Sequence, residues 1–157
     1  MDMTSIHQFL STTATELAIK VMAANTAYGV DELTEGYVKM VNRGLRPSQV
    51  EMTALADLAA SQGKTFDQLV EAVLDAMGAE FERLKEFGAK GKKAGEELEL
   101  TFKQVPYVIK NTGDEFQILE KHTGKLIDKF SSQEDAVMGV MTAFGKMEGI
   151  GGQNATM

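Results

Sequence analysis

The chain has 157 residues, of which 43% are hydrophobic and 25% are charged, and it contains no cysteine. These values are typical of a globular protein, and they exclude disorder of the whole chain, disulfides, thiolate zinc sites and cysteine nucleophiles. No apolar run approaches the ~20 residues of a membrane helix, and the N-terminal sequence lacks the features of a signal peptide, so we expect no membrane association and a cytoplasmic protein.

The formal net charge of −7 is unevenly distributed along the chain. Residues 1–86 carry a net charge of −6, residues 87–95 carry +3, and residues 96–157 carry −4. An acidic surface repels phosphate, so binding of nucleic acid by the whole surface is disfavoured. Only a local basic face would overcome this repulsion.

The N-terminal half predicts an arm over residues 1–12, followed by a helical domain over residues 13–87. Thr13 and Glu16 have the spacing of a capping box, in which a hydroxyl and a carboxylate satisfy backbone N–H groups at a helix start. Gly29 is expected to end this first helix, because glycine is common just after a helix C-terminus.

Three further helices are expected in this domain, because apolar residues recur at spacings of three and four. Asp31 would begin the second helix and Pro47 the third. Thr65 and Gln68 form another capping box, from which the fourth helix is expected to run to Gly88. Short joints favour an antiparallel bundle of about four helices. The residues expected on the buried faces are Leu17, Val21, Tyr28, Leu33, Tyr37, Val41, Val50, Ala54, Leu55, Leu58, Leu69, Val73, Met77, Phe81 and Leu84.

Residues 88–96, with the sequence GAKGKKAGE, combine three glycines with three lysines. Glycines among lysines invite comparison with a phosphate-binding loop, which needs GxxxxGK[ST] between a strand and a helix. Here no Ser or Thr follows the lysines, and the segment follows a predicted helix. We therefore predict a flexible hinge.

Residues 97–147 predict a small antiparallel sheet of three to four strands, backed by a helix. Apolar and polar residues alternate over residues 97–103, which is typical of a half-buried strand. A second strand begins at Tyr107, and strands over residues 116–121 and 126–130 form a hairpin around a glycine-bearing turn.

Ser131 and Glu134 have the spacing of a capping pair before the final helix. This helix is expected to cover one face of the sheet, and residues 148–157 are predicted to form a disordered tail. The sequence thus predicts an α+β protein. The residues expected between the sheet and the final helix are Leu98, Leu100, Phe102, Tyr107, Ile109, Phe116, Ile118, Val137, Met141 and Phe144.

No pattern typical of a catalytic or metal site is present in the sequence. The two histidines, His7 and His122, stand outside any metal-ligand or nucleophile motif. We therefore assign no catalytic, cofactor-binding or metal-ligating residue, infer no small-molecule substrate, and expect a protein that is not an enzyme.

The strongest functional candidate is the sheet face opposite the final helix. By strand parity this face mixes lysines with Val108, Leu119 and Ile127, a combination typical of a protein contact surface. The aromatic residues, which stack on bases in single-strand readers, are expected on the other face. The predicted partner-binding residues are Lys103, Val108, Lys110, Gln117, Leu119, Lys121, Lys125, Ile127 and Lys129.

We expect this acidic protein to act as an adaptor or inhibitor that binds another protein, or to associate with a second copy of itself. The alternative is a nucleic-acid-binding regulator that uses the lysines of the sheet. The order of elements over residues 66–146 is similar to that of double-stranded-RNA-binding domains. Those domains begin their last helix with lysines, whereas this one begins with Ser131 and continues SQED, and topology alone does not establish function. Whether the helical part covers the candidate face is left open.

Overall fold

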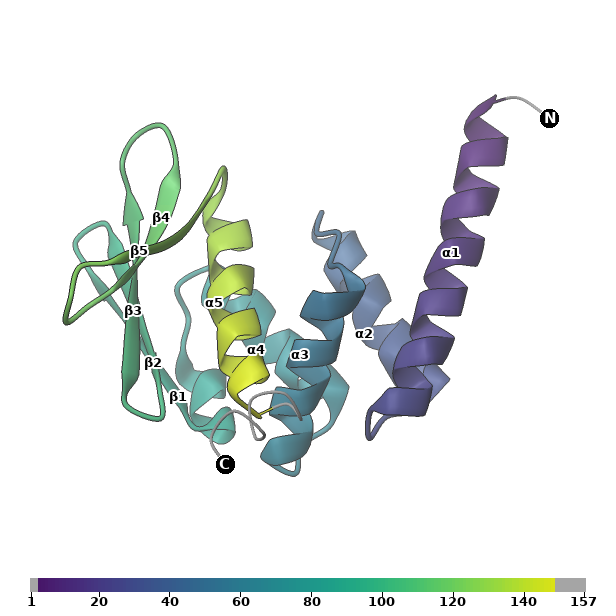
Figure 1. Ribbon diagram of the computed structural model, residues 1–157, viewed down its shortest axis with the longest axis horizontal. Coiled ribbons are helices and arrows are strands. Elements are labelled where there is room, and N and C mark those ends of the chain that lie inside the picture. Colours follow the sequence, from purple (N-terminus) through teal and green to yellow (C-terminus); the bar gives the residue numbers. More distant parts are fainter. Residues whose placement is uncertain (1–2, 149–157) are drawn as a thin grey trace.

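The structure, a computed structural model, describes residues 3–148, with side chains from residue 14 onward. Four α-helices come first in the chain, a short 3₁₀ helix follows them, and a sheet with a final helix completes the fold (Figure 1). The helices are α1 (Met3–Asn25), α2 (Val30–Asn42), α3 (Gln49–Ser61), α4 (Phe66–Met77), the 3₁₀ helix η1 (Glu82–Phe87) and α5 (Gln133–Glu148).

The sheet is an antiparallel meander in the order β1-β2-β3-β4-β5, so each strand pairs with its neighbour in the sequence. The predicted α+β class is confirmed, with four helices before an antiparallel sheet and a C-terminal helix. The sheet has five strands, however, and the predicted number of three to four is wrong. The strands are β1 (Ala89–Ala94), β2 (Glu97–Phe102), β3 (Val105–Asn111), β4 (Phe116–Glu120) and β5 (Leu126–Phe130).

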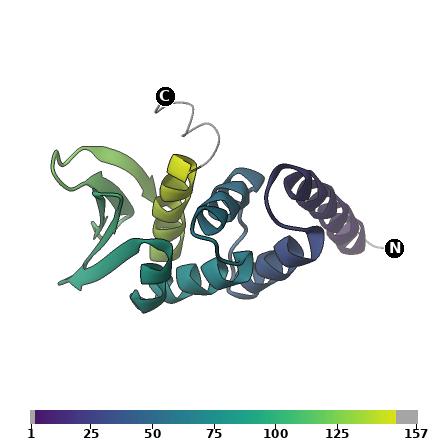
Figure 2. The same ribbon diagram turned by 90° about the horizontal axis from the view of Figure 1, so that it is seen from below.

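Helix α5 lies between the sheet and α3, as the two views in Figures 1 and 2 show. The two helices cross closely at Gly145, where an added Cβ would lie 2.0 Å from the carbonyl oxygen of Ala54. One continuous cluster of buried residues includes side chains of the helices and of the sheet. The division into domains at residues 13–87 and 97–147 stays a prediction. If the two parts were separate domains, the contact between α3 and α5 would have to be absent.

The predicted hinge contains a strand, because residues 89–94 pair along their whole length with β2. Gly88 and Gly95 have φ angles of 75° and 65°, and both therefore allow tight turns at the two ends of β1. Between them, Gly91 lies under the ring of Phe81, where a Cβ would come within 2.4 Å of Cγ. Backbone pairing and this close packing form the strand despite its poor β-propensity.

The first helix begins at Met3 and includes residues 3–12 of the predicted arm, whose separation from the helical domain stays a prediction, and residues 1–2 lie outside the described part. Thr13 is inside α1 and does not cap it. Ile19 and Met22 are the buried residues of α1, with 3% and 1% of their surface exposed. The expected inner residues Leu17 and Val21 are exposed, and the reason is that the packed face of the helix is rotated away from them.

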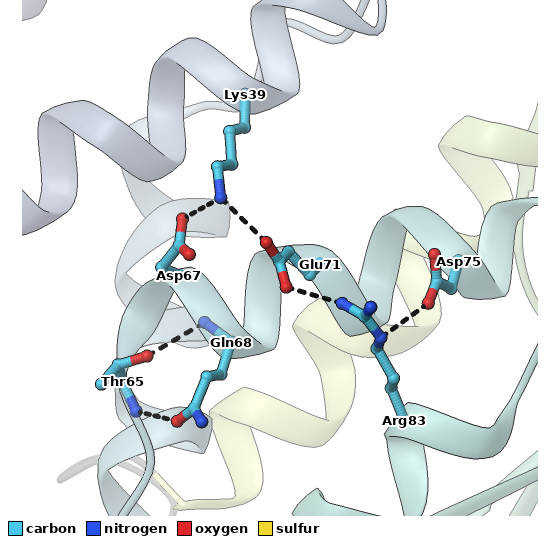
Figure 3. Close-up of polar contacts among 7 residues, drawn as sticks. All are labelled: Lys39, Thr65, Asp67, Gln68, Glu71, Asp75 and Arg83. Carbon is cyan, nitrogen blue, oxygen red and sulfur yellow. Dashed lines mark hydrogen bonds and ion pairs between the residues drawn. The ribbon is translucent and has the colours of Figure 1, made fainter.

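The fourth helix is shorter than predicted. Its capping box is confirmed, since the Thr65 hydroxyl accepts from the Gln68 N–H at 3.1 Å and the Gln68 amide oxygen accepts from the Thr65 N–H at 3.0 Å (Figure 3). The helix ends at Met77, because the backbone leaves the helical path at Ala79, which has a φ of 63°. Phe81 is then free to turn towards β1.

Strand alternation predicts the inner face of the sheet well. The confirmed buried residues of the sheet and α5 are Leu98, Leu100, Phe102, Ile109, Ile118, Val137, Met141 and Phe144.

The cap of α5 is one residue later than predicted. Ser132, next to the predicted Ser131, accepts the capping hydrogen bond of α5 from the Asp135 N–H at 3.1 Å. The predicted disordered tail lies outside the described residues from residue 149 onward. Within residues 3–148, no helix combines the length and the apolar character that a membrane crossing requires.

Candidate protein-binding site

The sheet face opposite α5, here called the outer face, has an apolar centre. Glu99, Val108 and Leu119 are cross-strand neighbours on β2, β3 and β4. Val108 and Leu119 are half-buried, although α5 packs on the other face. Together with Lys92 and Lys110 they line a shallow concavity of about 430 Å³.

The lysines of the outer face are partly neutralised. Glu99 lies between Lys121 and Lys92, with Nζ to carboxylate distances of 2.9 Å and 3.4 Å. The hydrogen bond from Lys121 is the main cause that lowers the pKa of the Glu99 carboxyl below its ordinary value. Among the described residues, the ammonium groups of Lys110 and Lys125 form no ion pair. The concavity is lined by three lysines and by three glutamates, Glu97, Glu99 and Glu120, so the face offers charges of both signs around an apolar centre.

Three other predicted partner-binding residues have different surroundings. Gln117 lies between Lys110 and Lys129 in the register of the sheet, and the Lys129 ammonium is 3.9 Å from the Glu115 carboxylate. Lys103 lies in the turn between β2 and β3 and pairs with Glu148 at the end of α5. Its ammonium is therefore drawn towards the α5 side of the sheet.

The register of β5 shifts at its start, and this shift changes the placement of Ile127. Ile118 pairs with Asp128, but Leu119 pairs with Leu126, so one residue of β5 is left over between these two pairs. Leu126 takes the position beside Leu119 that strand parity gave to Ile127. Ile127 instead lines a hollow on the α5 side of the sheet. Its role in partner binding stays a prediction.

This hollow, here called the β5 hollow, has a volume of about 340 Å³ and lies between β5, α5 and the start of α3. Ile127 and Phe130 of β5 line it together with Val50 of α3 and Thr142 of α5. Val50 is 58% exposed and Ile127 is 46% exposed, so apolar surface at the rim of the hollow is open to solvent.

Thr142 is an unusual residue in the wall of the β5 hollow. Only 7% of its surface is exposed, and its Oγ1 has no hydrogen-bond partner among the described residues. A buried hydroxyl without a partner costs about 1–3 kcal/mol. The hollow thus combines apolar side chains and a hydroxyl that lacks a hydrogen bond with three charged residues, Glu51, Asp128 and Lys146.

Sequence reasoning missed the β5 hollow because its walls come from segments that are far apart in the chain. Val50 was expected to be buried, and no local pattern connects it to Ile127. The register shift of β5 also could not be recognised from the alternation of apolar and polar residues over residues 126–130. Apolar residues in a short strand at the end of a meander were the one available hint.

The densest charge cluster of the described residues lies elsewhere, between α2, α4 and η1 (Figure 3). Lys39 contacts Asp67 at 2.6 Å and Glu71 at 3.0 Å, and Arg83 contacts Glu71 at 2.6 Å and Asp75 at 3.1 Å. These contacts raise the pKa of Lys39, chiefly through Asp67, and lower that of Glu71, chiefly through Lys39. The cluster connects three elements, and its carboxylates are paired with cations.

No metal-binding arrangement was found in the part of the chain that the structure describes, where groups of three or more His, Asp or Glu residues were sought. No protein-family model, no curated protein and no solved structure matches this chain. The geometry of the surface is therefore the basis for assigning a function.

Proposed function

We propose that the protein binds another protein, without catalysis, by accepting an extended segment of the partner as a new strand beside β5. The observation that carries this proposal is the combination of an open strand edge with the β5 hollow. Within residues 3–148, strand β5 pairs only with β4, and four of its five residues are exposed. An acidic adaptor or inhibitor protein is the class of function that fits such a surface.

An open edge strand offers backbone N–H and C=O groups to an incoming strand. Side chains of the added strand would point alternately to the two sides of the sheet. On one side they would meet Leu126 and Leu119, and on the other they would enter the β5 hollow. The preferred segment is therefore extended, with apolar side chains at alternate positions.

The free hydroxyl of Thr142 adds a polar requirement to this recognition. A segment that places a backbone or side-chain polar group in the hollow would supply the hydrogen bond that Thr142 lacks. A buried polar group makes binding specific when only the correct ligand forms a hydrogen bond with it.

Selection of short random peptides displayed on phage tests the proposal, with the purified protein as bait. We expect enriched peptides with alternating apolar residues, and a protection from hydrogen exchange in β5 when they bind. Ile127→Lys should weaken their binding roughly tenfold or more. Val38→Lys is the matched control, because Val38 is 47% exposed on α2, far from this edge.

The variant Thr142→Val separates binding from folding. Removal of an unsatisfied hydroxyl should leave the free protein as stable as before or more stable, while the affinity for the selected peptides falls. Peptides that bind Ile127→Lys and Thr142→Val as tightly as the unchanged protein would contradict the proposal. Failure to enrich any peptide that protects β5 would do so as well.

A nucleic-acid-binding regulator is the second candidate, favoured by the unpaired ammonium groups of Lys110 and Lys125. The ion pairs of Lys121 and Lys92 with Glu99 reduce the charge available for phosphate. We expect no appreciable binding of single- or double-stranded oligonucleotides near physiological salt. A micromolar, salt-sensitive affinity that is lost when Lys110, Lys121 and Lys129 are all replaced by Gln would favour this candidate instead.

A further inference from the structure

Over residues 14–25, whose side chains the structure describes, helix α1 has apolar residues on two faces. Its inner face, with Ile19 and Met22, packs against the rest of the helical part. A second apolar strip faces solvent, and Leu17 and Val21 in this strip are 59% and 50% exposed. An amphipathic helix normally has one apolar face, which is turned to the core, so the second apolar strip of residues 14–25 has no counterpart in this pattern.

The exposed strip has the spacing of a helix-pairing seam. Ala14, Leu17, Val21 and Ala24 are separated by three, four and three residues, and all four are exposed. Apolar residues with this alternation form the contact line between two helices that pack side by side. The strip is called the α1 seam below.

The charge of α1 differs from that of the rest of the chain. Its 23 residues include one acidic residue, Glu16, and one basic residue, Lys20, whereas the chain as a whole carries −7. At about 3.6 residues per turn, Lys20 lies beside the α1 seam, and Glu16 lies between the seam and the packed inner face, next to Ile19. The helix is thus a neutral segment on an acidic protein.

We propose that the α1 seam pairs with the same seam of a second copy, so that the protein is a homodimer. Two acidic copies repel each other wherever their charged surfaces meet, and the repulsion is smallest at a neutral face. An apolar strip without charge is complementary to itself, which is the requirement of a two-fold symmetric interface. A strongly acidic or basic partner would find almost no opposite charge on this helix.

The position of α1 allows such pairing. Figures 1 and 2 show α1 at the end of the molecule that is farthest from the sheet. Two copies joined through α1 would leave both β5 edges free, so the dimer would present two partner sites at its outer ends. Dimerisation and the proposed function therefore depend on different surfaces and can fail independently.

Sedimentation velocity over a range of protein concentrations tests the dimer. We expect the unchanged protein to dimerise at micromolar concentrations. The double variant Leu17→Glu with Val21→Glu should dimerise at least about tenfold more weakly, because each copy brings two charges into the seam. The control Val38→Glu, on the exposed side of α2, should dimerise like the unchanged protein. The melting temperature should rise with concentration for the unchanged protein and for the control, but not for the double variant.

A second measurement keeps the test decisive if the charged variant does not fold. The chain has no cysteine, so Val21→Cys gives one site for a nitroxide label. We expect a short distance between the labels of two copies, and no short distance when the label is at Lys129→Cys instead. A monomer at all concentrations, or a dimer that the double variant leaves unchanged, would overturn the proposal.

Discussion

The two edges of the sheet differ in a way that gives each a different role. Strand β1 presents Lys90, Lys92 and Lys93 at one edge, whereas β5 presents Leu126 and Ile127 at the other. Lysines on an edge strand oppose pairing with another chain, since pairing would bring their charges together and remove them from water. The edge at β1 thus carries more lysines than the edge at β5, where Asp128 and Lys129 accompany the two apolar residues and where we propose that a partner strand is added.

Both edge strands are fixed to the core in a similar manner, by an aromatic ring over a glycine. A Cβ on Gly91 would lie 2.4 Å from Cγ of Phe81, and a Cβ on Gly139 would lie 2.7 Å from Cζ of Phe130. Cγ is the fixed end of a ring and Cζ is its free end. We therefore expect the β1 edge to yield less readily to an added methyl group than the β5 edge.

The largest effect is expected for Gly145→Ala, which would disrupt the packing of α5 on α3. The new methyl group would collide with the backbone of Ala54, and a backbone atom has little freedom to move away. We expect a loss of about 3 kcal/mol or more in the free energy of unfolding, measured by urea denaturation. Gly78→Ala is the control, because its Cβ would make only an ordinary contact of 3.5 Å with the oxygen of Asp75.

Equal stability of Gly145→Ala and the unchanged protein would show that α5 does not pack on α3 in solution. The predicted division of the chain into two domains would then gain support.

The second prediction compares the two edges directly. Gly91→Ala should cost about 2 kcal/mol, because Phe81 must move as a whole, while Gly139→Ala should cost less than about 1 kcal/mol, because Phe130 can rotate its free end outward. Urea denaturation of both variants measures the difference. If Gly139→Ala proves the more costly of the two, the β5 edge is the more rigid one and the comparison is reversed.

The features that sequence could predict are those encoded by neighbouring residues. The Thr65 capping box and the alternation of Leu98, Leu100 and Phe102 were correct, because a cap needs four residues and a strand face needs every second one. The face of α5 followed from its helical spacing in the same way. Such signals do not depend on the rest of the fold.

The features that sequence did not reveal depend on distant contacts. Strand β1 looks like a linker in isolation, and it forms because β2 pairs with it and Phe81 packs over Gly91. The β5 hollow joins Val50 to Ile127, and the register shift of β5 moves Ile127 to that side of the sheet. Half of the predicted site, around Val108 and Leu119, was placed on the correct face because β3 and β4 are regular.

The third prediction concerns the two ion pairs that Glu99 of β2 forms on the outer face, with Lys92 of β1 and with Lys121, the residue after β4. The pKa of Glu99 is lowered from its ordinary value of 4.5, so its contribution to stability is present above about pH 4.5 and is lost as the pH falls through the lower, folded-state pKa. The advantage of the unchanged protein over Glu99→Gln should therefore disappear in acid. Exposed ion pairs contribute about 1 kcal/mol or less, so a small difference in urea midpoint is expected. A difference that persists at low pH would assign the effect to packing.

The smallest effect on stability is expected for the double variant Lys90→Val with Lys93→Val, which would make the β1 edge resemble β5. Neither lysine forms an ion pair within the described residues, so the melting temperature should change little. Self-association, measured by light scattering, should increase because the protection of the edge is removed. If this variant scatters no more light than the unchanged protein, the lysines do not protect the edge.

The position of α5 in the chain also determines the order in which the protein can fold. The five strands of the meander pair only with sequence neighbours, so the sheet can form one hairpin at a time, and local contacts of this kind form quickly. On the ribosome, however, residues 133–148 are made after every strand, and until then Phe102 and the α3 surface at Ala54 have no cover. Docking of α5 should thus be the late step of folding, in which the helical part and the sheet acquire their shared core together.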